Sequence, residues 1–118
     1  MSRADRLSSN LRLPTSVVYT SADSNPTIVN QGSYYLDPTS TITTITIGAP
    51  LAGTIMTIYN ESGSSVTLNT GSSITSLRLS TSNDDVDNNT MTLEDNTLTT
   101  IFVITNTMAV VSGTGTLV

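Results

Sequence analysis

The sequence predicts an all-β fold: a small antiparallel β-sandwich, jelly roll or barrel with an extended N-terminal arm. Ser and Thr supply 40 of the 118 residues, and the branched Cβ of Thr suits a pleated strand. Short apolar runs recur about every 8 to 14 residues, separated by Gly, Pro, Asn and Asp and without a helical period. Charged residues make up only 11% of the chain, which argues against disorder.

The expected core is thin for a chain of this length. A single domain fits 118 residues, but only 36% of them are hydrophobic. Five are aromatic, namely Tyr19, Tyr34, Tyr35, Tyr59 and Phe102. Packing against further copies of the same chain would bury more apolar surface, so the composition favours self-association.

Residues 1–30 are predicted to form the extended arm and residues 31–118 the β body. Ser, Asn and Asp recur in the first segment, and its two prolines bias the preceding residues toward extended backbone. Three of the four arginines fall here, on a chain of net charge −5. We therefore expect a cationic arm that docks on an acidic partner through Arg3, Arg6, Leu11, Arg12, Leu13, Val17, Val18 and Tyr19.

The first part of the body reads as short strands separated by turns. Residues 34–36 are followed by an Asp-Pro turn at Asp37, and residues 41–47 are almost entirely β-branched. Gly48 and Pro50 then break the chain. Residues 54–60 and 66–69 flank the turn sequence ESGSS, and we expect them to form a hairpin.

The second part of the body contains the most apolar strand. Residues 74–79 and 91–93 flank a polar loop, and residues 98–105 and 108–112 form a predicted tight hairpin around Asn106. Because residues 101–104 are apolar on both faces of the pleat, we expect a central strand covered on both sides. Thr pairs do not recur at a fixed spacing, so a β-solenoid is not favoured. We interpret the Thr residues as the outward halves of strands.

Composition excludes most catalytic chemistry. The chain has no His, Cys, Lys or Trp, so nucleophile-and-base pairs and most transition-metal sites cannot be built. Glu61 and Glu94 are carboxylates of the kind that glycosidases pair, but the aromatic platforms of sugar sites are scarce here. We expect no enzyme activity, no catalytic residue, no cofactor and no small-molecule substrate. The acidic balance also argues against nucleic acid and membrane partners.

An acidic loop provides the one candidate for metal binding. Asp85, Asp87 and Asn89 alternate like the first ligands of a calcium loop. Thr90 stands where that loop needs Gly, and Asn96 stands where it needs a bidentate Glu. The sequence therefore favours a solvated turn-forming loop, and no metal site is predicted.

Residues 53–115 resemble a pattern common in virion proteins of tailed bacteriophages. The matching elements are GTIMTIYNESGSSVTL, TLEDNTLTTIFVI and TNTMAVVSGTG, a Gly-led strand, an N-x-S-G turn, a second strand and a closing hairpin. That pattern often carries Trp in the last hairpin, where this chain has Met108. Similar sequences occur in head decoration (cement) proteins, head fibres and tail fibres, whose small β modules commonly form trimers.

The length of the chain resembles that of decoration proteins more than that of fibres. The resemblance implies a homotrimer that binds the major capsid protein on the outer surface of the virion after synthesis in the host cytoplasm. Two alternatives remain open: a tail-fibre or head-fibre module, and an adhesin that binds a receptor or polysaccharide. In the adhesin, the binding surface would be Tyr34, Tyr35 and the loop at residues 82–89.

Overall fold

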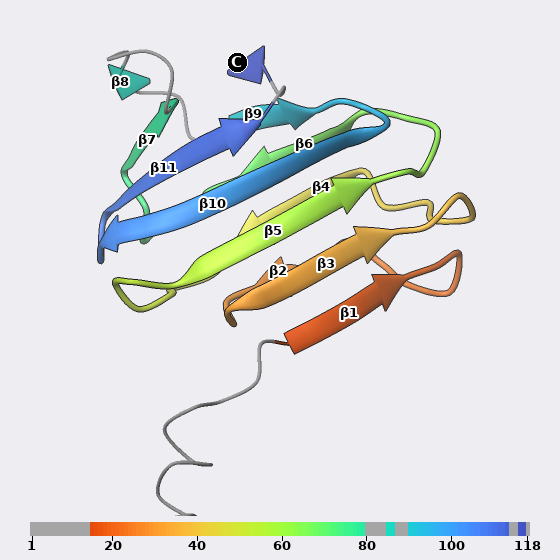
Figure 1. Ribbon diagram of the computed structural model, residues 1–118, viewed down its shortest axis with the longest axis horizontal. Helices are drawn as coiled ribbons and strands as arrows, with labels where there is room; N and C mark the ends of the chain where they lie inside the picture. Colours follow the sequence, from red (N-terminus) through yellow and green to blue (C-terminus); the bar gives the residue numbers. More distant parts are fainter. Residues whose placement is uncertain (1–14, 80–84, 87–89, 114–115, 118) are drawn as a thin grey trace, which may run out of the picture.

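The computed structural model describes residues 15–79, 85–86, 90–113 and 116–117, the backbone alone in the case of residues 85, 86, 116 and 117. Its described residues form strands and turns, with no helix, and therefore no helix that could span a membrane. The strands lie in two sheets that face each other (Figure 1). The predicted all-β class is thus confirmed, and the two facing sheets are consistent with the expected sandwich.

The larger sheet, sheet A, has seven strands in the order β1-β3-β5-β10-β11-β7-β8. Their bounds are β1 Thr15–Tyr19, β3 Gly32–Leu36, β5 Ile55–Asn60, β10 Thr97–Thr105, β11 Met108–Gly113, β7 Ser76–Leu79 and β8 Asp85–Val86. Sheet B has five strands in the order β12-β9-β6-β4-β2. These are β12 Thr116–Leu117, β9 Thr90–Leu93, β6 Val66–Asn69, β4 Thr44–Ile47 and β2 Thr27–Ile28.

The first six strands alternate between the two sheets, so this half of the chain winds around the core in successive turns, each with one strand in either sheet. Strands β1, β3 and β5 run parallel in sheet A, and β2, β4 and β6 run parallel in sheet B. Successive turns of this winding contain different numbers of residues: Thr15 pairs with Gly32, 17 residues on, and Gly32 pairs with Met56, 24 residues on. This inequality removes any fixed sequence period and explains why the sequence does not favour a solenoid.

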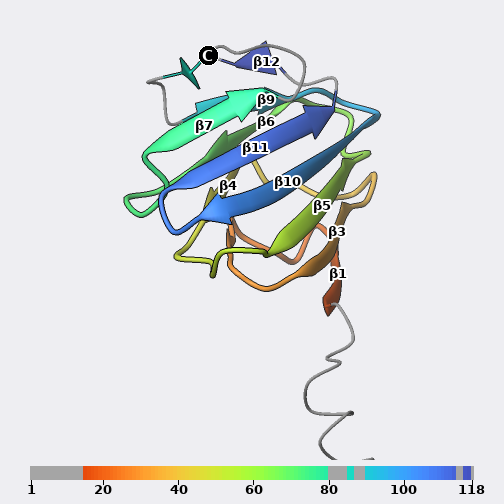
Figure 2. The same cartoon turned by 60° about the vertical axis from the view of Figure 1, so that its left-hand side comes forward.

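The second half closes both sheets with antiparallel strands. Strand β10 pairs with β5 and with β11, and β9 pairs with β6 (Figure 2). The predicted hairpin around Asn106 is confirmed by the β10–β11 register. Strand β11 then pairs in parallel with β7. Because five of the ten described pairings are parallel, the sheets are mixed, and the expected wholly antiparallel arrangement is wrong.

The core fills the space between the sheets, where alternate residues of each strand point inward. Inward residues of sheet A include Met56, Ile58, Ile101, Val103 and Val111, and those of sheet B include Ile45, Ile47, Val66, Leu68, Met91 and Leu93, all at most 1% exposed. Two loop residues, Ile42 and Ile74, add to this layer. The apolar residues of the chain are concentrated in this layer, so a chain with only 36% hydrophobic residues still forms a closed core.

A buried amide joins the strand ends on one side of the sandwich. Asn60 is fully buried at the end of β5, and its side-chain nitrogen donates to the carbonyls of Ser64 and Leu93. Its side-chain oxygen accepts from the backbone and hydroxyl groups of Ser62. These contacts take the chain from sheet A to sheet B instead of back along β5, so the hairpin expected for residues 54–60 and 66–69 does not form.

The structure places part of the predicted arm within the sandwich. Thr15–Tyr19 forms the edge strand of sheet A, and Thr27–Ile28 pairs with β4 in sheet B. Residues Arg3, Arg6, Leu11, Arg12 and Leu13 lie outside the described residues. Of the predicted contact residues that are described, Val17 and Tyr19 pack against the core and Val18 faces outward.

Candidate functional site

The outer face of sheet A is the candidate site, because large apolar side chains gather there in solvent. Exposed fractions are 55% for Val18, 39% for Ile55, 54% for Leu98, 40% for Phe102 and 40% for Ile104. Scattered single exposures are ordinary on protein surfaces, but these five occupy one face of one sheet. We call this surface the apolar face.

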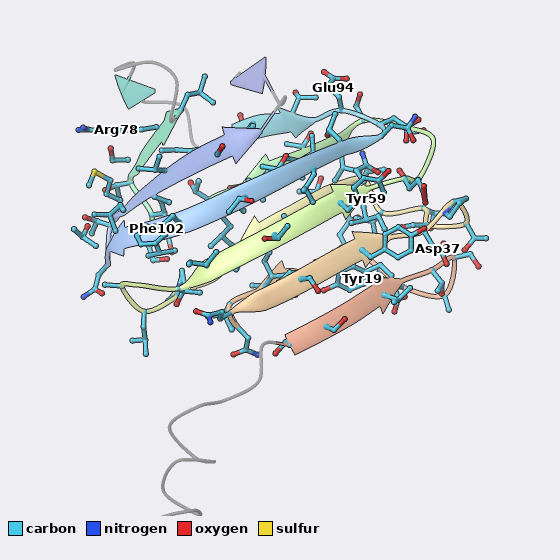
Figure 3. The ribbon with its side chains drawn as sticks, in the orientation of Figure 1. Tyr19, Asp37, Tyr59, Arg78, Glu94 and Phe102 are labelled. Carbon is cyan, nitrogen blue, oxygen red and sulfur yellow. The ribbon has the colours of Figure 1, made fainter. Side chains whose placement is uncertain are left out.

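Strand register arranges the apolar face into three rows that cross the strands. The tyrosine row contains Val18, Tyr35, Tyr59 and Leu98, each the register partner of the next. The hydroxyl row contains Ser16, Ser33, Thr57, Thr100 and Ser112. The phenylalanine row contains Ile55, Phe102, Val110 and Arg78. Figure 3 shows Tyr59 and Phe102 towards opposite ends of the sheet.

The hydroxyl row forms a furrow between two ridges. Ser and Thr are short, whereas the side chains of the flanking rows are long, and rows on one face are about 6.5 Å apart along the strands. The furrow deepens into an open depression of about 270 Å³ lined by Gln31, Gly32, Ser33, Ile55 and Thr57. The face therefore has relief as well as apolar character.

The middle of the tyrosine row is a hydrogen-bonded aromatic pair. The rings of Tyr35 and Tyr59 stack with centroids 5.9 Å apart. The Tyr35 hydroxyl donates to the carboxylate of Glu61, and this hydrogen bond raises the pKa of Tyr35 to about 12. The bond uses the polar atom of Tyr35 within the chain, so this part of the row presents mainly ring surface.

The outer face of sheet B is different in chemistry. Its outward positions are Thr27, Thr44, Thr46, Thr67, Asn69, Thr90 and Thr92, between inward apolar residues of the same strands. Register aligns Thr44, Thr67 and Thr92 in one row. The interpretation of Thr as the outward half of strands is confirmed here. One sandwich thus presents a hydroxyl face and an apolar face.

The described carboxylates gather in loops at one end of the sandwich. Asp23 accepts from the Thr20 backbone and Asp37 from the Thr39 backbone. Glu94 accepts from Ser65, and Asp95 accepts from the Gly63 backbone. Figure 3 shows Asp37 and Glu94 at this end and Arg78 at the other. These bonds indicate that the carboxylates stabilise turns.

The other predicted sites have mixed outcomes. Asp87 and Asn89 lie outside the described residues, and only the backbone of Asp85 is described. Among the described side chains, no three acidic groups lie close enough to hold a metal ion. Tyr34, expected on an adhesin surface, is 4% exposed and stacks on Tyr19 inside the sandwich, while Tyr35 lies on the apolar face.

Comparison with protein-family models gives no match, and comparison with curated protein sequences gives no significant similarity. The apolar face must therefore be interpreted from its own chemistry. It can bury apolar surface against a protein of matching relief, and its described side chains offer hydroxyl groups for hydrogen bonds across such a contact.

Proposed function

We propose that this chain is a structural virion protein that decorates the outer surface of a phage capsid as a homotrimer and stabilises it. The observation that carries the proposal is the apolar face, a broad surface on a small sandwich with five large exposed apolar side chains. Surfaces of this kind mark protein contacts. The resemblance of residues 53–115 to virion β modules supplies the class of partner.

The arrangement suits decoration because two kinds of contact are available on different parts of the chain. The apolar face serves self-association, and the arginine-rich segment before Thr15 serves the capsid. Three such segments in one trimer would bind together, so that weak individual contacts produce high avidity. Stabilisation of the shell then follows because each trimer links neighbouring capsid subunits.

The test is binding to undecorated capsids assembled from the major capsid protein of the phage that encodes this chain. Full-length protein is mixed with capsids, which are then sedimented, and the bound fraction is measured over a concentration series. We expect saturable binding and a higher capsid melting temperature. In the triple variant Arg3→Ser, Arg6→Ser, Arg12→Ser we expect at least about tenfold weaker binding, because each site loses three cations.

The control variant is Thr67→Asp, which changes the net charge on the outer face of sheet B, away from the arm and from the apolar face, and should bind capsids like the unmodified chain. Failure of the full-length protein to bind contradicts the proposed function. Equal binding by the triple variant contradicts the role of the arm alone. Binding to a polysaccharide on a glycan array, without binding to capsids, favours the adhesin alternative.

A further inference from the structure

The two outer faces of the sandwich differ in chemistry. Both are built from strands whose residues alternate between inward and outward positions, yet sheet B turns Thr outward and sheet A turns Val, Tyr, Leu, Ile and Phe outward. Only sheet A carries rows of large apolar side chains in the part of the chain that the structure describes. A face that stays in water does not need them.

Strand β10 points to the same face. It is the fourth of seven strands in sheet A, and residues 101–104 are apolar on both sides of the pleat. Ile101 and Val103 are fully buried, whereas Phe102 and Ile104 are each 40% exposed. Strands with apolar residues on both faces are normally covered on both faces. The residues that the structure describes cover only one.

We infer that further copies of this chain cover the apolar face, so that sheet A is the self-association surface. The inference deepens the proposed function, on which it rests for the number of copies. In the assembly, the tyrosine row or phenylalanine row of one copy lies in the hydroxyl row of another. Packing of two sheets at about 10 Å allows side chains to interdigitate in this way.

Charge favours a copy over an unrelated acidic or basic partner. The chain carries a net charge of −5, but Arg78 is the only charged side chain described on the three rows. The carboxylates of Asp23, Asp37 and Asp95 are engaged in loops beyond the strand ends. Two apolar faces can therefore meet with one described carboxylate, Glu61, at their margin, where it accepts from the Tyr35 hydroxyl, whereas a highly charged partner would find few matching charges.

Relief and area also suit a second copy. The face presents ridge, furrow and ridge, so the same surface supplies both the projecting and the receiving part. Strands β1 to β11 span about 24 Å and the rows about 20 Å along them, or roughly 480 Å² in plan. Side-chain relief raises the accessible area above this value, towards the roughly 800 Å² per partner of a stable interface.

The experiment compares Thr57→Lys with Thr67→Lys by sedimentation equilibrium of the full chain. Both residues are outward Thr on neighbouring strands in the sequence, but Thr57 is in the middle of the apolar face and Thr67 is on sheet B. We expect the unmodified chain and Thr67→Lys to sediment at a multiple of 12.4 kDa. We expect Thr57→Lys to sediment as single chains of unchanged circular dichroism.

A second measurement avoids the added charge. Since the chain has no Cys, Thr57→Cys and Thr67→Cys each create a single thiol. The rate at which each thiol is alkylated reports whether another copy of the chain covers it. We expect the thiol of Thr57→Cys to react at least about tenfold more slowly at high protein concentration, and the two rates to converge on dilution. A single-chain mass for the unmodified protein, or equal thiol rates at every concentration, overturns the inference.

These outcomes separate the inference from the proposed function. A chain that assembles through sheet A but does not bind capsids contradicts the proposed function and leaves the inference standing. A chain that binds capsids while the thiol of Thr57→Cys stays as reactive as that of Thr67→Cys contradicts the inference alone.

Discussion

Tyr35 shows how one hydrogen bond sets the character of a residue on the apolar face. Its ring stacks on Tyr59 and its hydroxyl donates to Glu61, so the phenol keeps its proton at a pH where other tyrosines lose it. Ionisation would place a phenolate beside a carboxylate, which is unfavourable. Tyr35 therefore stays neutral over the whole physiological range.

We predict that Glu61→Gln lowers the pKa of Tyr35 from about 12 toward the ordinary value of 10.0. Because the folded pKa is the higher one, the contribution of this proton to folding is complete below pH 10. It is lost as the pH rises through about 12. Tyrosinate absorbance measured against pH reports the change, with Tyr35→Phe to assign the signal.

The matched control is Glu94→Gln, since Glu94 accepts from Ser65 and not from a tyrosine. It should leave the tyrosine titration unchanged. A Tyr35 phenol that still titrates near 12 in Glu61→Gln would show that the carboxylate is not the cause.

Outward and inward residues of the site were only partly predictable from the sequence. The apolar run at residues 101–104 predicted a central strand covered on both faces; β10 is central, but Phe102 and Ile104 are exposed among the described residues. Val18 was predicted as a contact residue of the arm, whereas the structure places it in the tyrosine row through pairing with Tyr35. Its row partners come from strands distant in sequence, and a single sequence does not contain their register.

At the scale of elements, the turns between strands depend on glycines with positive φ. Gly63, after β5, has φ 89° and a Cβ there would meet no atom within 4 Å. Gly71, after β6, has φ 68°, and a Cβ there would lie 2.8 Å from the carbonyl oxygen of Ile47. The two positions share a backbone requirement but differ in the space available.

We predict that Gly63→Ala lowers the free energy of unfolding by about 1–2 kcal/mol, from backbone conformation alone. Gly71→Ala should cost about 1–3 kcal/mol more, because the β4 backbone must also move. Urea denaturation of both variants, monitored by circular dichroism, measures the difference. Equal losses of unfolding free energy would mean that the backbone at Ile47 can move away from the added methyl group without a cost in stability.

The sequence predicts where strands lie better than how they connect. Residues 34–36, 91–93, 98–105 and 108–112 all fall in strands, because alternation and turn residues are local signals. The turn at residues 61–65 was expected to close a hairpin, but it crosses to the other sheet. A five-residue turn allows either path, and the choice rests on Asn60, whose partners include Leu93, 33 residues away.

For the whole molecule, the sandwich separates its polar and apolar surfaces by face and its carboxylates by end. Thr covers sheet B, apolar rows cover sheet A, and the described acidic groups occupy loops at one end. Self-association through sheet A would add a third apolar layer to a chain with a thin core. The same contact would leave the acidic loops in solvent.

The salt dependence of assembly follows from this separation. Since the three rows carry one described cation, Arg78, and the carboxylate beside them, Glu61, is bonded to Tyr35, copies held by the apolar face form no extensive set of ion pairs. We predict that raising NaCl from low to physiological ionic strength changes the dissociation constant by less than about threefold, and in the direction of tighter binding, because it screens the net charge of −5. Sulfate should strengthen association further, as it does for apolar contacts in general. Sedimentation equilibrium in both salts measures this, with Thr57→Lys as the variant that should stay monomeric throughout. Weakening by about tenfold in NaCl would mean that ion pairs, and not the apolar face, hold the copies together.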